Sequence, residues 1–303
     1  MIVIIGTPAE DPVRRLVDAA RAEGVEALVL DETAAADWNL RVGSGPEGRY
    51  ARLAGADGEV DLAGATGLYL RLTAPGRTGP VPDPLEQDRH DAAIALAAGW
   101  ADVAAMRVAN RPRAMASNGS KPYQAALIRS FGLAVPPTLV TNDPAAVQGF
   151  WDQHGRLVYK SASGVRSIVH ELTPARGADL ARVRHLPTQF QRLLEGTNVR
   201  VHVVGAAVFA CEIGAATIDY RYREGGEAAT MRAVELPPAV AERCVAVAAA
   251  LDLPFAGIDL LRDDDGNWWC FEVNPSPAYS CFEEPTGLPI AAALARWLAG
   301  EGE

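Results

Sequence analysis

Acidic and amide side chains gather in one stretch of the sequence, residues 256–277. Two apolar runs in it, residues 257–261 and 268–271, flank the pair Asp265-Gly266. An Asp-Gly pair between two apolar runs is a strong short-range signal for a tight β-hairpin turn. The stretch is therefore predicted to fold back on itself as two antiparallel strands.

The register of this predicted hairpin brings two carboxylates together. If residue 264 faces residue 267, then Asp259 lies directly opposite Glu272, and Asn274 points to the same face because strand side chains alternate. Opposed carboxylates destabilise a strand pair unless a cation lies between them. Carboxylate and amide oxygens suit Mg²⁺, so we expect Asp259, Glu272 and Asn274 to be metal ligands.

A plainer interpretation is a surface hairpin whose carboxylates face water, since acidic residues are usually solvated. The flanking residues favour a cleft instead. Both strands are largely apolar, with Phe255, Ile258, Leu260, Phe271 and Val273.

Composition excludes several classes of protein. The 303 residues carry a net charge of −10, which argues against a nucleic-acid partner. The four cysteines form no C-x-x-C pair and the five histidines lack metal-ligand spacing, so we expect reduced thiols, a cytoplasmic location and no zinc site. The apolar N-terminus is predicted to be a strand rather than a signal peptide, and no apolar run is long enough to span a membrane.

The first part of the chain is predicted to be an α/β unit. Apolar strands at 2–5 and 25–30 enclose an amphipathic helix at 12–23, which is typical of a parallel β-α-β start. A further strand at 67–72 ends in Arg71, and a long helix follows at 83–106. The first strand-to-helix turn lacks the G-x-G-x-x-G pattern, so an ordinary turn is favoured over a dinucleotide site.

A second candidate site follows the strand predicted at 156–160. Lys160 ends this strand, and the small residues of 161–167, with Ser163 and Gly164, come directly after it. Small residues let backbone N–H groups approach phosphate oxygens, and the lysine adds a point charge. Alone the pattern is weak, because a lysine at a strand end is more often solvated, and no Walker G-x-x-x-x-G-K sequence is present.

The order of these features resembles the ATP-grasp superfamily, in particular the ligases that glutamylate a ribosomal protein tail and the microviridin-type graspetide ligases. The resemblance covers about 110 to 298. Its residues are Gly-Ile-Asp259-Leu-Leu, Phe-Glu272-Val-Asn274-Pro-Ser-Pro, Phe190-Gln191, the run 199–209, the lead-in 132–142 and Asp219-Tyr-Arg221.

The resemblance implies an α/β and α+β architecture, an ATP-grasp fold behind an N-terminal α/β domain. We expect that domain at 1–112, a central lid at 113–187, and a C-terminal subdomain with the Mg²⁺ and ATP site at 188–303.

The resemblance also implies roles for individual residues. Lys121 and Lys160 would contact ATP phosphates, and Arg200 and Arg221 would face the transferred phosphoryl group. The alternative for each arginine is a surface salt bridge. Arg71 is a candidate contact for a substrate carboxylate. The remaining nucleotide-contacting residues, with Glu195 at the ribose, would be Ser163, Gly164, Gln191, Arg192, Leu193, Leu194, Glu195 and Asn198.

The implied reaction is an ADP-forming ligation of a carboxylate to an amine or a hydroxyl through an acyl phosphate. The cofactors would be ATP and one or two Mg²⁺ ions, with Mn²⁺ as a substitute. The substrate would be a peptide or a small molecule, a homodimer is an option, and nucleic acids and membranes are not expected partners. The alternatives are a ligase of small amino acids, a kinase that stops at the phosphorylated product, and a non-catalytic ATP-binding module.

Overall fold

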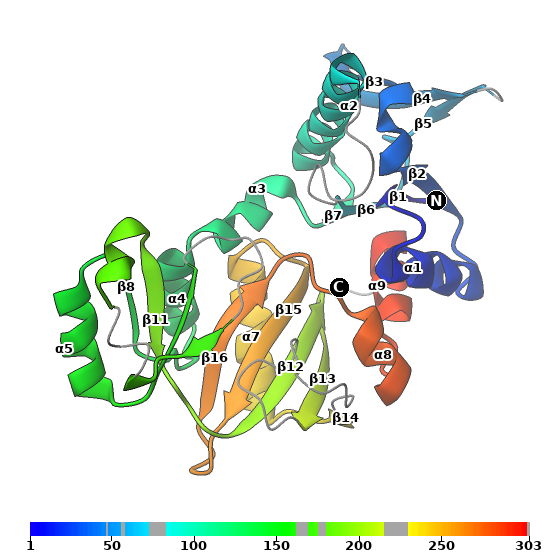
Figure 1. The fold of residues 1–303 in the computed structure, drawn as a ribbon. Helices are drawn as coiled ribbons and strands as arrows, with labels where there is room; N and C mark the ends of the chain where they lie inside the picture. The colour runs from blue at the N-terminus through cyan, green and yellow to red at the C-terminus, as the bar shows by residue number, and fades with distance from the viewer. Residues whose placement is uncertain are drawn as a thin grey trace.

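The residues that the structure describes form four β-sheets. Helices pack on these sheets (Figure 1). The structure is a computed structural model that describes residues 1–46, 48–55, 58–72, 83–161, 169–174, 180–214 and 230–301. None of the helices in these segments is both long and apolar enough to cross a membrane.

The N-terminal unit is built on a parallel sheet. Its strand order is β2-β1-β6-β7, and its strands are β1 (Ile2–Gly6), β2 (Ala27–Asp31), β6 (Gly67–Arg71) and β7 (Arg107–Ala109). Every residue of β1 is buried, as expected for a parallel strand covered on both faces. The predicted α/β start is confirmed.

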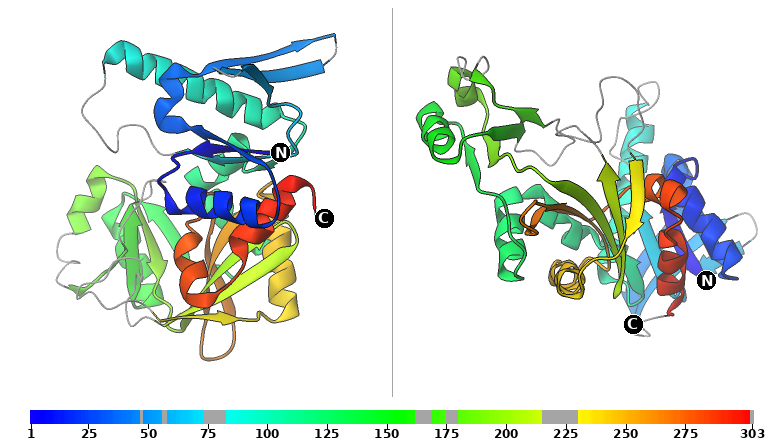
Figure 2. Two further views of the ribbon diagram at one scale, coloured as in Figure 1. Left: turned by 90° about the vertical axis from the view of Figure 1, so that its right-hand side faces the viewer. Right: turned by 90° about the horizontal axis from the view of Figure 1, so that it is seen from below.

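Two helices from opposite ends of the sequence cover one face of this sheet. Helix α1 (Asp11–Ala22) packs beside α9 (Ile290–Ala299), and both contribute to a core with Ile2 and Ile4 (Figure 2). The other face packs against α2 (Pro84–Val103). The N-terminal unit therefore shares its core with a C-terminal helix.

A small antiparallel sheet and three short helices complete the first part of the chain. The small sheet consists of the strands β3 (Asn39–Gly45), β4 (Gly48–Gly55) and β5 (Gly58–Asp61). The short helices are η1 (Glu32–Asp37), α3 (Pro112–Met115) and η2 (Ala116–Gly119).

The central sheet has the order β10-β9-β11-β8. Its strands are β8 (Thr138–Thr141), β9 (Leu157–Ser161), β10 (His170–Glu171) and β11 (Thr188–Arg192), and its helices are α5 (Pro144–His154) and η3 (Leu180–His185). The side chains of Leu157 and Phe190 pack towards α5 in a small core.

The central sheet runs past residue 187, the last residue of the expected lid. Strand β11 pairs with β8 and β9, so this sheet extends to Arg192, and the next sheet begins at Thr197. Helix α4 (Lys121–Ser130), expected in the lid, packs on the C-terminal sheet instead. The alternation of Gln189-Phe190-Gln191 predicts a strand but does not indicate which sheet it joins.

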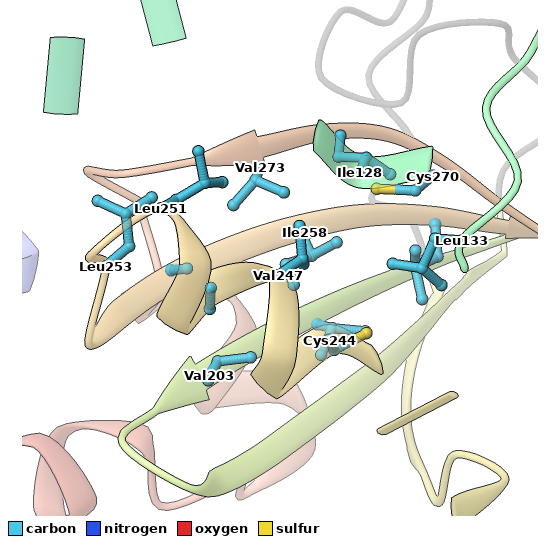
Figure 3. Close-up of a cluster of buried hydrophobic side chains, with 14 of the residues drawn as sticks. Ile128, Leu133, Val203, Cys244, Val247, Leu251, Leu253, Ile258, Cys270 and Val273 are labelled. Carbon is cyan, nitrogen blue, oxygen red and sulfur yellow. The ribbon is translucent and has the colours of Figure 1, made fainter. Parts of the chain in front are cut away.

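The C-terminal sheet carries most of the candidate site. Its order is β14-β13-β12-β15-β16, with β12 (Thr197–Val204), β13 (Ala207–Gly214), β14 (Thr230–Val234), β15 (Phe255–Arg262) and β16 (Trp268–Asn274). Helix α7 (Pro238–Ala250) covers one face and packs with α4 around Val247, Ile258 and Cys270 (Figure 3). Helix α8 (Ser280–Thr286) contacts the other face through Phe282, and α9 contacts β12.

Candidate functional site

A row of side chains crosses the C-terminal sheet on the face opposite α7. Cys211 faces Arg200, Arg200 faces Asp259, and Asp259 faces Glu272, on four adjacent strands. Cross-strand partners point to the same face of a sheet. The predicted opposition of Asp259 and Glu272 is confirmed.

The turn that sets this register is not the expected one. The Asp263 N–H donates to the Asn267 carbonyl at 3.0 Å, and Arg262 faces Trp268, so the loop is one residue longer than predicted. A β-bulge at Phe271 restores the alignment, because Leu260 faces Cys270 while Asp259 faces Glu272. The expected pairing of residue 264 with 267 is therefore wrong, and the bulge cancels the error.

Cationic side chains from three elements reach the two carboxylates. Lys121 Nζ of α4 lies 2.5 Å from Glu272 Oε1, and Lys160 Nζ of β9 lies 3.9 Å from Glu272 Oε2. Arg200 Nη1 of β12 lies 2.7 Å from Asp259 Oδ1. These contacts offset the repulsion between the carboxylates, and they bring together five residues far apart in sequence.

Helix α4 is fixed to β16 by a residue that the sequence analysis did not single out. The buried Gln124 side chain donates to the Val273 carbonyl at 2.8 Å and accepts from the Val273 N–H at 3.0 Å. Lys121 lies three residues earlier on the same helical face, which directs its ammonium group to Glu272. The i, i+3 spacing of a lysine and a glutamine at a helix start is the signal that could have indicated this pair.

A buried asparagine holds the ends of the hairpin strands. Asn110 Nδ2 donates to the carbonyls of Phe255 and Pro275, each at 2.5 Å, and its Oδ1 accepts from the Phe255 N–H at 3.2 Å. Asn274, the third predicted metal ligand, accepts a hydrogen bond from the Ser276 N–H at 2.9 Å through its Oδ1. The loop after β16 is thus anchored close to Asn274.

Residues 191–195, which are predicted to contact the nucleotide, connect the central sheet to the C-terminal sheet. Gln191 Nε2 donates to Thr138 Oγ1 at 2.9 Å. The Arg192 N–H donates to the Pro137 carbonyl at 3.0 Å, and the Leu193 N–H donates to the Arg156 carbonyl at 2.9 Å. Both N–H groups are therefore used in hydrogen bonds at the end of the central sheet.

The other predicted nucleotide contacts are spread around this junction. Glu195 forms an exposed ion pair with Arg156, and Asn198 lies in β12 opposite Leu261, in the row next to Arg200. Lys160 lies opposite Gln189 in the central sheet. Leu194 lies in the segment that connects β11 to β12. Ser163, Gly164 and Arg221 fall outside the described residues.

Arg71 lies apart from the carboxylate pair and ties the N-terminal sheet to the loop after β16. Its Nε donates to Glu10 Oε2 at 2.8 Å, and its Nη1 donates to the Pro277 carbonyl at 3.2 Å and to Ser276 Oγ at 3.4 Å. The loop after Asn274 therefore runs directly past Arg71.

Few metal-binding side chains lie together in the candidate site. Across the described segments, no three or more histidine, cysteine or acidic side chains gather in a way that could hold an ion. The predicted trio contains two carboxylates and the amide of Asn274, so its metal role stays a prediction.

Known proteins resemble this chain in sequence and in fold. Residues 160–298 match the family model for the RimK-like ATP-grasp domain. A ribosomal protein bS6–L-glutamate ligase of Escherichia coli O7:K1 is 30% identical over 185 residues, which cover 57% of this chain and 60% of the relative. The chain thus aligns with less than two thirds of that relative's length.

Solved structures match over nearly the whole chain. The ATP-grasp ligase PsnB, complexed with a phosphomimetic variant of its minimal precursor, Mg and ADP, is 29% identical with a TM-score of 0.80, covering 99% of this chain and 97% of PsnB. The macrocyclase MdnC from Microcystis aeruginosa MRC, bound with the precursor peptide MdnA, has a TM-score of 0.81 at 18% identity and covers 99% of each chain, a likeness of fold. Residues 160–298 thus match a RimK-like ATP-grasp domain, and nearly the whole chain is similar in fold to the ATP-grasp ligase PsnB.

Proposed function

We propose that this protein is an ATP-dependent, ADP-forming ligase that joins a carboxylate to an amine or a hydroxyl through an acyl phosphate. The observation that carries the proposal is the convergence of Lys121, Lys160 and Arg200 on the opposed pair Asp259 and Glu272. Such an arrangement of fixed charges suits phosphoryl transfer, which depends on positioning and charge neutralisation more than on covalent help from the protein.

Asp259, Glu272 and Asn274 have the donor chemistry to hold Mg²⁺. Two carboxylates already face each other, and the Asn274 Oδ1 that accepts from Ser276 has a second lone pair for a metal. Bound there, Mg²⁺ would neutralise charge on the phosphates of ATP. Lys121 and Lys160 would then turn from Glu272 towards the phosphate oxygens.

The nucleotide would lie between the central and C-terminal sheets. Lys160 and Gln191 belong to the central sheet, and Asn198, Arg200 and Asp259 belong to the C-terminal sheet. The backbone of Arg192 to Leu194, at the junction, would contact the adenine, with Glu195 exchanging its Arg156 partner for the ribose. Ser163 and Gly164 would close over the phosphates.

The reaction would proceed in two steps. An oxygen of the substrate carboxylate attacks the γ-phosphorus, the bond to the β-γ bridging oxygen breaks, and ADP leaves. The amine or hydroxyl then attacks the acyl carbon and inorganic phosphate leaves. Arg200, together with Arg221, would stabilise the negative charge on the transferred group, and Arg200 is already held rigidly before substrate binds.

Within this class we favour a peptide substrate. PsnB, which is complexed with its precursor, resembles this chain along almost its entire length. The substrate carboxylate would enter between the N-terminal sheet and the loop after β16, where Arg71 lies beside Ser276 and Pro277. A cytoplasmic location, with a supply of ATP, fits this proposal.

The deciding experiment measures ADP release by the purified protein with Mg²⁺ and ATP, across a panel of peptides, amino acids and amines. Adding hydroxylamine should trap the acyl phosphate as a hydroxamate, with one ADP formed per hydroxamate. ATP binding without ADP release on any substrate would contradict the ligase and favour a non-catalytic module. A stable phosphorylated product that gives no hydroxamate would indicate a kinase.

A further inference from the structure

The guanidinium group of Arg200 is enclosed on several sides. Its side chain is only 5% exposed, Nη1 pairs with Asp259, and the Phe282 ring centroid lies 5.7 Å from its Cζ. A Cβ atom added to Gly257 would lie 2.0 Å from Arg200 Nη2, so the guanidinium packs directly on that glycine. Few orientations of the group are therefore open.

A histidine completes this enclosure. His202 lies two residues after Arg200 on the same strand and face, is fully buried, and sits opposite Gly257. Arg200 Nε donates to His202 Nε2 at 3.4 Å. This contact at Nε is long, and together with the Asp259 contact at Nη1 it restrains the guanidinium plane at two points.

The direction of this hydrogen bond determines the form of the imidazole. A guanidinium group has donors and no acceptor, so His202 Nε2 must offer its lone pair. The ring is then neutral and carries its proton on Nδ1. Burial, and next the charge of Arg200, hold the pKa of His202 well below its usual value, while the Ala278 carbonyl favours a ring proton to a lesser degree.

The packing around His202 does not by itself call for a polar side chain. Its ring centroid lies 5.2 Å from that of Phe282, and its cross-strand neighbours are Phe209 and Gly257. Nδ1 has no partner in hydrogen-bond geometry among the described residues. An apolar residue of similar size would fill this space at lower desolvation cost, and the hydrogen bond from Arg200 at Nε2 gives the histidine a polar role.

We propose that His202 is a positioning residue that aims Arg200, by accepting from its Nε as a neutral Nδ1-protonated imidazole. This inference rests on the proposed function, in which Arg200 faces the transferred phosphoryl group. His202 itself touches neither substrate nor metal. A second restraint on Arg200 would keep the guanidinium directed into the cleft when substrate phosphates compete with Asp259 for it.

The kinetic test compares His202→Leu, which keeps similar volume without an acceptor, with His202→Gln, whose amide oxygen can accept from Arg200. We expect His202→Leu to lower kcat for ADP release about tenfold to a hundredfold, the worth of one hydrogen bond to a charged group, with little change in KM for ATP. His202→Gln should recover most of that loss. The control is Val201→Ala, a buried change on the opposite face of the same strand.

Three outcomes would overturn the proposal. The leucine and glutamine variants could lose kcat equally, the change could be confined to KM, or the Val201→Ala control could lose as much kcat as His202→Leu.

A second readout requires no turnover. In the ligand-free protein, ¹⁵N spectra should show His202 protonated at Nδ1 and unprotonated at Nε2, and the Arg200 Nε–H signal should persist in His202→Gln and broaden in His202→Leu. The proposal would be overturned if the ring is protonated at Nε2, or if the Arg200 Nε–H signal is the same in wild type, His202→Gln and His202→Leu. If wild-type protein releases no ADP, the ligase proposal fails, and these spectra still decide the role of His202.

Discussion

Lys121 Nζ lies 2.5 Å from Glu272 Oε1 although the two residues are 151 positions apart in the chain. Lys121 is the first residue of α4, where the helix dipole disfavours a positive charge. Its ammonium group is held there by Glu272 and by Asn118 Oδ1 at 2.6 Å. In the proposed ligase, this cation at an unfavourable helix end would bind the phosphates of ATP.

Replacing Glu272 by alanine tests the proposed metal and phosphate site. We expect Glu272→Ala to lower Mg²⁺-dependent ADP release by about a hundredfold or more, because a ligand of the metal and the partner of two lysines is lost. The fold should persist, with a loss of about 1 kcal/mol in the free energy of unfolding, since removing one carboxylate also relieves its repulsion with Asp259. Steady-state kinetics and urea denaturation measure the two effects.

The matched control is Glu284→Ala, which removes an exposed glutamate that pairs with Arg15 on the surface. It should leave both kinetics and stability close to wild type. Normal ADP release by Glu272→Ala would refute the assignment of Glu272.

Replacing Gln124 by leucine tests how α4 is held. The variant leaves the buried N–H and carbonyl of Val273 without their partners, so we expect a loss of about 2–3 kcal/mol in the free energy of unfolding. ADP release should also fall, because Lys121 is no longer fixed against Glu272. Urea denaturation gives the stability, with Gln148→Ala in the exposed part of α5 as the control, which should change it by less than about 0.5 kcal/mol.

Replacing Gly257 by alanine tests the space beneath Arg200. The new methyl group would meet Arg200 Nη2 at 2.0 Å and Pro277 Cβ at 2.7 Å, so the guanidinium must move. We expect a stability loss of about 1–3 kcal/mol and a fall in kcat of about tenfold or more.

Gly99→Ala in helix α2 is the contrasting change, because a Cβ there meets nothing within 4 Å. It should stabilise the protein by about 0.5–1 kcal/mol and leave kcat unchanged. If Gly257→Ala and Gly99→Ala have the same kcat, the packing of Arg200 on Gly257 does not contribute to activity.

The depressed pKa of His202 predicts a specific dependence of stability on pH. Below its ordinary pKa of 6.5 the unfolded chain takes up a proton that the buried ring does not, so the stability that this residue contributes is present above that pH and falls as the pH is lowered. One proton corresponds to a slope of at most about 1.4 kcal/mol per pH unit. The thiols of Cys211 and Cys281 on neighbouring elements have pKa values raised by burial and stay neutral in this range.

The measurement is urea denaturation of wild type and His202→Gln from pH 7.5 to pH 5. The difference between the two curves isolates this residue from the carboxylates. Parallel curves would mean that His202 titrates alike in the folded and unfolded states.

The hairpin shows what a sequence can and cannot predict. Alternation and the Asp265-Gly266 signal were enough to place Asp259 opposite Glu272 on one face. They did not predict that the turn is a residue longer or that Phe271 forms a bulge, because both depend on how the strand twists against its neighbours. The two deviations compensate, so the functional pair is preserved.

Contacts between distant segments were the part that the sequence could not supply. The resemblance to a known family pointed to Lys121, yet Gln124 and Asn110 act by binding backbone groups more than 140 residues away. Apart from the spacing of Lys121 and Gln124, nothing in the local pattern marks such partners, since a polar residue at these positions is compatible with solvent. The sequence also did not predict that β11 joins the central sheet, because tertiary packing decides which strands pair.

The position of α9 has a consequence for how the protein is made. Strand β1 and helix α9 share one core, and Gly67 of the same sheet packs so closely on α9 that a Cβ would lie 2.4 Å from the Leu298 carbonyl. The cover that α1 gives this face of the N-terminal sheet is completed only when α9 has been synthesised. This unit therefore cannot complete its core from its own residues alone, and its folding has to wait for the C-terminal helix.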